Sequence, residues 1–159
     1  MKESDDVRRT AENEGLPAGP AGNVKELTMD ATVENLDRAL AFLDGELEAL
    51  ECSMKIQMQL DIALEELFVN VAHYAYTPEI GPVTLRIAAQ QEPKAVSITL
   101  IDRGVPYDPL AKPDPDVTLS AAERQIGGLG IYMVKKSVDD IRYEYRDGRN
   151  VLTITKNLG

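Results

Sequence analysis

Glu66 and Asn70 are the first residues whose types and spacing could do chemistry. They stand four residues apart in a long apolar stretch, so a helix there would place a carboxylate and a carboxamide on adjacent turns of one face. The carboxylate could accept a proton from an attacking hydroxyl group or water. The carboxamide oxygen suits Mg²⁺, which prefers oxygen ligands and keeps several waters beside substrate phosphates. Taken alone, the pair also fits a solvent-facing acid next to an asparagine without function.

Asp102 and Gly104 form the second motif, directly after the apolar run from Val96 to Ile101. A carboxylate at the end of a strand can accept hydrogen bonds from an exocyclic amine, such as N6 of adenine. A glycine beside it lets a flat ring approach the backbone, because no Cβ intervenes. Asp-x-Gly is also frequent in ordinary turns, so this motif is weak by itself.

Gly127, Gly128 and Gly130 form the third motif, before a helix predicted from Ile131 to Val138. Backbone N–H groups at a helix N-terminus, with the helix dipole, make a site for an anion such as phosphate. A flexible linker is the alternative, but a linker would not need to run straight into an apolar helix. The proline-rich segment 105–126 exceeds the usual loop length of about 12–15 residues, which favours a lid hinged at these glycines over a surface loop.

Hydrophobic periodicity predicts the elements that must position these motifs. Apolar residues at steps of three and four predict helices from Val33 to Leu50 and from Met54 to Tyr76. The second helix places Glu66 and Asn70 beside its apolar stripe, at the rim of the core. Period-two alternation predicts strands near 24–29, 83–87, 96–100, 141–145 and 151–155. This order predicts an α+β two-layer sandwich, with a mixed, mostly antiparallel sheet and helices on one face.

Length and charge limit the classes of protein that fit. The 159 residues predict a single domain over 24–159, preceded by a flexible tail over 1–23 that is polar and rich in glycine and proline. The formal charge of -10 argues against nucleic-acid binding and leaves open a basic protein partner or a merely solvated acidic surface. The longest stretch without Asp, Glu, Lys or Arg is twelve residues, too short for a membrane helix. A single cysteine fits a reducing cytoplasm.

Other nucleotide and metal motifs are missing. The sequence has no Gly-x-x-x-x-Gly-Lys-Ser/Thr, which excludes a P-loop, and no cysteine–histidine cluster for zinc. In order and spacing, the three motifs resemble the N, G1 and G2 boxes of the GHKL ATPase superfamily. The stretches 63–76, 102–109 and 127–131 resemble, more closely, bacterial anti-sigma-factor serine/threonine kinases. The resemblance covers about residues 24–158 and implies the GHKL, or Bergerat, ATPase fold with ATP and Mg²⁺ as cofactors.

The resemblance implies a role for each matching residue. Glu66 matches the general base that activates the substrate hydroxyl or water, and Asn70 matches the magnesium ligand. Asp102 matches the adenine reader, with Gly104 beside it. His73 stands where histidine-kinase relatives place a phosphate-contacting basic residue, although a histidine at a helix edge fits equally.

The resemblance also covers the phosphate side and shows two departures. Gly127, Gly128 and Gly130 match the lid hinge and phosphate loop, and Arg124 would neutralise the γ-phosphate. Pro106 replaces the second glycine of the general G1 box. The threonine pair that usually follows near Gly148 is missing, which leaves either Asn150 or Thr153 to complete the adenine pocket.

The implied function is that of a cytoplasmic, ATP- and Mg²⁺-dependent serine/threonine protein kinase acting as an anti-sigma-type regulator in partner switching. Its expected partners are an anti-anti-sigma (antagonist) protein as substrate, a sigma factor, and a second copy in a homodimer, with no nucleic acid or membrane. Two alternatives remain: a non-catalytic, nucleotide-gated protein-binding module and a detached histidine-kinase-like catalytic domain. The presence of Glu66 favours the enzyme, because a pure binder needs no base.

Overall fold

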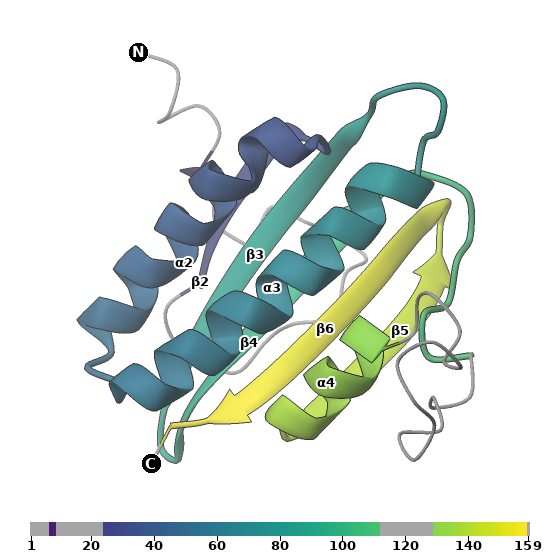
Figure 1. Cartoon of the computed structure of the whole chain (residues 1–159). Helices are drawn as coiled ribbons and strands as arrows, with labels where there is room; N and C mark the ends of the chain where they lie inside the picture. Colours follow the sequence, from purple (N-terminus) through teal and green to yellow (C-terminus); the bar gives the residue numbers. More distant parts are fainter. Residues whose placement is uncertain (1–6, 9–23, 112–128, 159) are drawn as a thin grey trace.

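A six-stranded sheet with helices on one face organises the protein (Figure 1). The structure is a computed structural model that describes residues 7–8, 24–111 and 129–158. Its strands lie in the order β1-β2-β3-β4-β6-β5, and each neighbouring pair is antiparallel. The predicted α+β two-layer sandwich is therefore confirmed. Among the described helices, none is both long and apolar enough to span a bilayer.

The elements follow the predicted order. Their bounds are β1 (Val7–Arg8), β2 (Val24–Asp30), the 3-10 helix η2 (Val33–Asn35), α2 (Leu36–Ala49), α3 (Met54–Tyr74), β3 (Pro82–Gln91), β4 (Lys94–Asp102), α4 (Leu129–Ser137), β5 (Asp140–Arg146) and β6 (Arg149–Asn157). Ser53 begins α3, because its hydroxyl oxygen accepts a hydrogen bond from Ile56 N at 3.2 Å. The helix ends two residues earlier than predicted, since Pro78 disfavours helical backbone at Thr77.

The N-terminal segment adds one feature to the prediction. Val7 and Arg8 form a two-residue strand that pairs with Leu27 and Glu26 of β2 at the edge of the sheet. The rest of the predicted tail lies outside the described residues, and so does the predicted lid beyond Ala111. Their flexibility and hinge therefore stay predictions.

The hydrophobic core lies between the sheet and the helices. Helix α3 runs across the middle of the sheet (Figure 1) and buries a broad face. The largest fully buried side chains come from both layers: Leu43, Leu47, Leu60, Leu64, Leu67, Phe68, Val83, Leu85, Ile87, Ile98, Leu100 and Ile154. Because full burial of each such side chain stabilises the fold by about 1.5–3 kcal/mol, α3 is held rigidly against the strands that end at the site.

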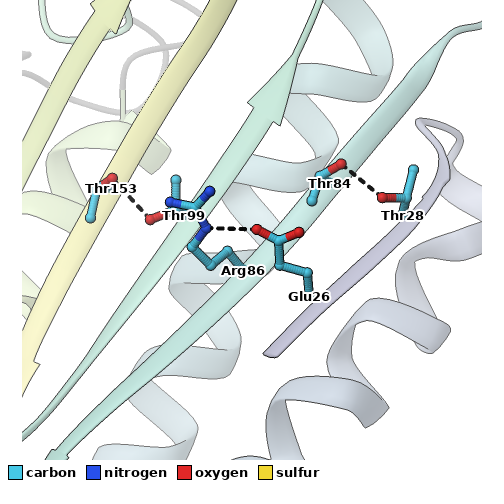
Figure 2. A network of polar contacts seen from close by, with 6 residues as sticks. All are labelled: Glu26, Thr28, Thr84, Arg86, Thr99 and Thr153. Carbon is cyan, nitrogen blue, oxygen red and sulfur yellow. Dashed lines mark hydrogen bonds and ion pairs between the residues drawn. The ribbon is translucent and has the colours of Figure 1, made fainter. Parts of the chain in front are cut away.

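The opposite face of the sheet carries a row of polar contacts between neighbouring strands. Figure 2 shows the ion pair of Glu26 with Arg86, together with the hydroxyl pairs Thr28–Thr84 and Thr99–Thr153. The ion pair joins Arg86 Nε to Glu26 Oε2 at 2.8 Å, and both side chains are buried. Alternation along each strand puts these residues opposite the core. The two faces of the sheet are thus chemically distinct.

Candidate functional site

A pocket lies between the C-terminal half of α3 and the ends of β4, β5 and β6. With its open mouth it encloses about 430 Å³. Its apolar wall and polar groups come from segments far apart in sequence: Leu67, Asn70, Val71, Tyr74 and Ala75 of α3 and its cap; Leu100, Asp102, Val105, Tyr107 and Pro109 of β4 and the segment after it; and Tyr143, Asn150 and Leu152. The predicted Asn70 and Asp102 therefore meet in one pocket.

Asp102 is the last residue of β4 and is buried. Its Oδ1 accepts hydrogen bonds from Gly104 N at 2.8 Å and Asn150 Nδ2 at 2.9 Å, while Oδ2 accepts none from the described residues. Burial raises the pKa of this carboxyl group above its ordinary value, and the two hydrogen bonds oppose that rise. A ligand that donates a hydrogen bond to Oδ2 would stabilise the ionised form, and an exocyclic amine is such a donor.

Asn150 connects the groups around Asp102. Its Nδ2 also donates to Val105 O at 2.9 Å, and its Oδ1 accepts from Tyr107 N at 3.2 Å and from the Tyr143 hydroxyl. Thr153, the other residue left open by the sequence, bonds to Thr99 at 3.0 Å on the far face of the sheet (Figure 2). Strand alternation explains the difference, because positions 150 and 153 point to opposite faces.

Three tyrosines form a part of the site that the motifs did not indicate. Tyr74 and Tyr107 stack with ring centroids 5.9 Å apart and planes 29° apart, and Tyr143 lines the pocket beside them. Tyr74 lies one turn after Asn70 on α3, and Tyr107 follows the Asp102 motif by five residues. Their nearness to the motifs was the available signal. Aromatic faces of this kind suit a flat ring as ligand.

Glu66 lies one turn before Asn70 on α3, against the first turn of α4. A Cβ added to Gly130 would overlap Glu66 Oε1 and come within 2.8 Å of its Cδ. The glycine thus allows the carboxylate to approach the N-terminal end of α4. The first and third motifs, 64 residues apart, are thereby in contact, although Glu66 itself does not line the pocket.

Gly104 has a packing reason to be glycine. A Cβ there would lie 2.5 Å from the carbonyl carbon and 2.6 Å from the Cβ of Ala75, at the end of α3. The next residue, Val105, donates its N–H to Ala75 O at 2.9 Å. The missing side chain therefore faces the helix end, and the predicted contact of Gly104 with a ligand stays a prediction.

The phosphate side of the predicted site is described only in part. His73 is exposed, meets the Tyr74 ring edge-on at 6.1 Å and does not line the pocket. Arg124, Gly127 and Gly128 lie outside the described residues. No three His, Cys, Asp or Glu side chains within the described ranges group to hold a metal ion. The donor set present, a single carboxamide at Asn70, fits a cation that takes its other ligands from water and a phosphate substrate.

Known proteins of similar sequence agree with the resemblance that the motifs indicated. Serine/threonine-protein kinase BtrW of Bordetella bronchiseptica is 27% identical over 131 residues, which are 82% of this chain and 92% of BtrW. Serine-protein kinase RsbW of Bacillus cereus is 27% identical over 97 residues, which are 58% of this chain and 59% of RsbW.

A solved structure has the same fold. The crystal structure of the RsbU and RsbW domains of Rv1364c from Mycobacterium tuberculosis superposes with a TM-score of 0.62 at 19% identity. The match covers 86% of this chain and 33% of that one. Residues 29–156 match the sequence model of the family described as histidine kinase-like ATPase domain. The chain therefore belongs to the histidine kinase-like ATPase domain family.

Proposed function

We propose that this chain is an ATP- and Mg²⁺-dependent serine/threonine protein kinase. The observation that carries the proposal is the meeting of Asn70 and Asp102 in one pocket. Glu66 lies one turn before Asn70 on α3 and contacts the first turn of α4. This arrangement brings together a hydrogen-bond acceptor for adenine at Asp102, a magnesium ligand at Asn70 and, one turn away, an acceptor for a hydroxyl proton at Glu66. The names of the relatives BtrW and RsbW support the same activity.

The pocket suits the adenine base of ATP. The apolar wall, with Leu67 and Leu152 on two sides, would exclude water from the ring faces. Asp102 Oδ2 would accept a hydrogen bond from the exocyclic amine, and Asn150 would hold the carboxylate in place through Oδ1. GTP, which has a carbonyl where ATP has this amine, would be rejected.

Asn70 and Glu66 would act at the phosphate end. Asn70 Oδ1 would hold Mg²⁺, which when bound neutralises charge on the phosphate oxygens. Glu66 would accept the proton of a substrate serine as its oxygen attacks the γ-phosphorus. The bond between that phosphorus and the bridging oxygen breaks, the phosphoryl group passes to serine, and ADP leaves with the electron pair.

The protein substrate and the binding partners follow from the kind of relative. We expect the substrate serine on an anti-anti-sigma antagonist protein, a sigma factor as the alternative partner, and a homodimer acting in the cytoplasm. Transfer of labelled phosphate to a candidate antagonist tests the substrate. Light scattering after size-exclusion chromatography tests the dimer.

Glu66→Ala separates catalysis from binding. We expect ATP affinity to stay within about threefold of wild type, while phosphoryl transfer falls by about 10²–10⁴-fold, the usual contribution of a general base. Calorimetry measures the affinity, and radiolabel transfer from ATP to an antagonist protein measures the rate. An exposed acid of α2 provides the control, because Glu48→Ala should change neither quantity. If ATP binding and transfer fell equally in Glu66→Ala, Glu66 would not be the base.

A further inference from the structure

The first half of α3 carries an apolar stripe on its outer side. Met54, Met58 and Ile62 are 69%, 56% and 55% exposed. Steps of four residues align them along one side of the helix over about 12 Å. Single exposed apolar residues are common, whereas a contiguous set marks an interaction surface.

The core does not account for this stripe. On its other side the same stretch of α3 already buries Leu60, Ala63 and Leu64 at 1% exposure or less. Among the described elements, α2 and α4 lie beside α3 and leave its outer side uncovered (Figure 1). The stripe also contributes no residue to the pocket, which is lined by the C-terminal half of the same helix. It therefore serves neither folding nor the proposed nucleotide site.

Exposed acidic groups lie near the two ends of the stripe. Glu51 precedes Met54 by three residues, and Glu65 follows Ile62 by three; both are exposed. Along its side, Asp61 of α3 faces Asp44 of α2. Burial and this neighbouring carboxyl group raise the pKa of Asp61 to about 7, so Asp61 carries only part of a negative charge near neutral pH. Lys55 is the exposed base in this stretch of α3. Glu51 and Glu65 thus put negative charge near the two ends of the stripe, on a chain whose formal charge is -10.

The apolar stripe and the nearby acids favour one kind of binding partner, an α-helix. An α-helix surface presents no unpaired backbone groups, so a docked strand would leave its own N–H and C=O groups without partners, whereas a docked helix satisfies them internally. Three anchors about 6 Å apart match side chains on successive turns of such a helix. A second copy of this chain would set acid against acid, which like-charge repulsion opposes.

We propose that the surface formed by Met54, Met58 and Ile62, with Glu51 and Glu65 near its two ends, docks a basic amphipathic helix of a protein partner. Apolar residues on successive turns of that helix cover the stripe, and flanking Lys or Arg residues meet the acids. Methionine side chains adapt readily to different apolar partners. This docking surface goes beyond the proposed kinase activity, since it uses no residue of the pocket.

The test uses the full chain and a fluorescein-labelled model peptide that is helical, with Leu on successive turns and Lys on both flanks. Fluorescence anisotropy measures its affinity. The double variant Met58→Gln/Ile62→Gln should weaken binding at least tenfold. Ile80→Gln is the matched control, because Ile80 is 66% exposed in the connection between α3 and β3, and this variant should bind the peptide within twofold of wild type. A peptide with Glu in place of Lys should bind at least tenfold more weakly.

Three results would overturn the proposal: equal binding by the double variant, equal binding of the Glu peptide, or a shift of the double variant from dimer to monomer with peptide affinity unchanged. The last would assign the stripe to self-association. ATP affinity of each variant is measured in parallel and should stay at the wild-type value. If the wild-type chain binds the peptide as expected but not ATP, the kinase proposal fails and the docking surface stands.

Discussion

At the scale of single residues, the site is organised around one carboxamide. Asn150 bonds to Asp102, to the backbone of Val105 and Tyr107, and to the Tyr143 hydroxyl. Its removal would leave buried polar groups without partners, each at a cost of about 1–3 kcal/mol. The orientation of Asp102 toward a ligand therefore depends on a residue 48 positions later in the chain.

Asn150→Ala should weaken ATP binding by about 10–100-fold, because the lost hydrogen bonds release both Asp102 and the Tyr107 segment. Thr153→Ala is its matched control on the same strand, since Thr153 faces away from the pocket. It should bind ATP within about twofold of wild type. Isothermal titration of both variants checks this, and equal losses in the two would contradict the assignment of Asn150.

At the scale of elements, the end of α3 and the turn after β4 are packed in direct contact. Gly104 is the contact point, because its backbone lies against Ala75. This packing places the Asp102 motif beside the Asn70 turn. Elsewhere α3 meets α2 through the carboxyl pair of Asp61 and Asp44. The packing at Gly104 favours the folded state, whereas the carboxyl pair costs stability once Asp61 is ionised.

Gly104→Ala should destabilise the fold by about 1–3 kcal/mol, because the new methyl group meets rigid backbone. Gly45→Ala on α2 is the control with the opposite expected sign. A Cβ there meets nothing within 4 Å, so alanine should stabilise the helix by about 0.5–1 kcal/mol. Urea unfolding measures both changes. An unchanged unfolding free energy for Gly104→Ala would contradict this prediction, because it would mean that the turn can move away from Ala75 at little cost.

The Asp44–Asp61 pair should make stability fall as pH rises. The folded pKa of Asp61, about 7, lies above its ordinary value of 3.8, so the folded state holds a proton that the unfolded state releases. The pair's contribution is fully present below pH 3.8 and is lost as pH rises through about 7.

Asp61→Asn should therefore raise the unfolding free energy at pH 8 by the order of 1 kcal/mol, after allowance for solvent screening, and leave it nearly unchanged at about pH 3.5. Glu48→Gln, at an exposed acid of α2, is the control and should show no such pH dependence. Urea titrations at the two pH values test this. An equal increase of the unfolding free energy at both pH values would contradict the raised pKa of Asp61.

At the scale of the whole molecule, helix α3 carries two distinct surfaces. The C-terminal half of α3 lines the pocket, and its N-terminal half presents the apolar stripe. The sheet below supports both, through a core that reaches from β2 to β6. A ligand that binds the folded state must raise the apparent stability of this whole unit.

ATP with Mg²⁺ should raise the thermal unfolding midpoint of the chain. At a concentration of about 100 times the dissociation constant, binding adds about 2.7 kcal/mol. GTP should give a smaller shift, because guanine has a carbonyl oxygen in place of the adenine N6 amine from which Asp102 would accept a hydrogen bond. Omitting Mg²⁺ should reduce the ATP shift if Asn70 holds the ion. Thermal-shift titrations measure all three, and equal shifts with ATP and GTP would remove Asp102 as the adenine reader.

The sequence by itself determined the elements and the family. Periodicities of 3.6 and 2 are local, so α3, the β3–β4 pair and the β5–β6 pair could be predicted within a few residues. The motifs at Glu66 and Asn70, at Asp102 and at Gly127 to Gly130 together carried the resemblance that predicted the ATPase fold, which the family match confirms. The same alternation along β6 would have selected Asn150 over Thr153, because Leu152 and Ile154 mark the core face.

Only the tertiary structure decided which distant residues meet. The contact of Glu66 with Gly130, the hydrogen bonds from Asn150 to the Asp102 turn and the stacking of Tyr74 on Tyr107 each join separate elements. The reason why Gly104 must be glycine also appears only where the turn meets the end of α3. Local patterns encode which face of an element is buried, whereas contacts between elements depend on how those faces pack together.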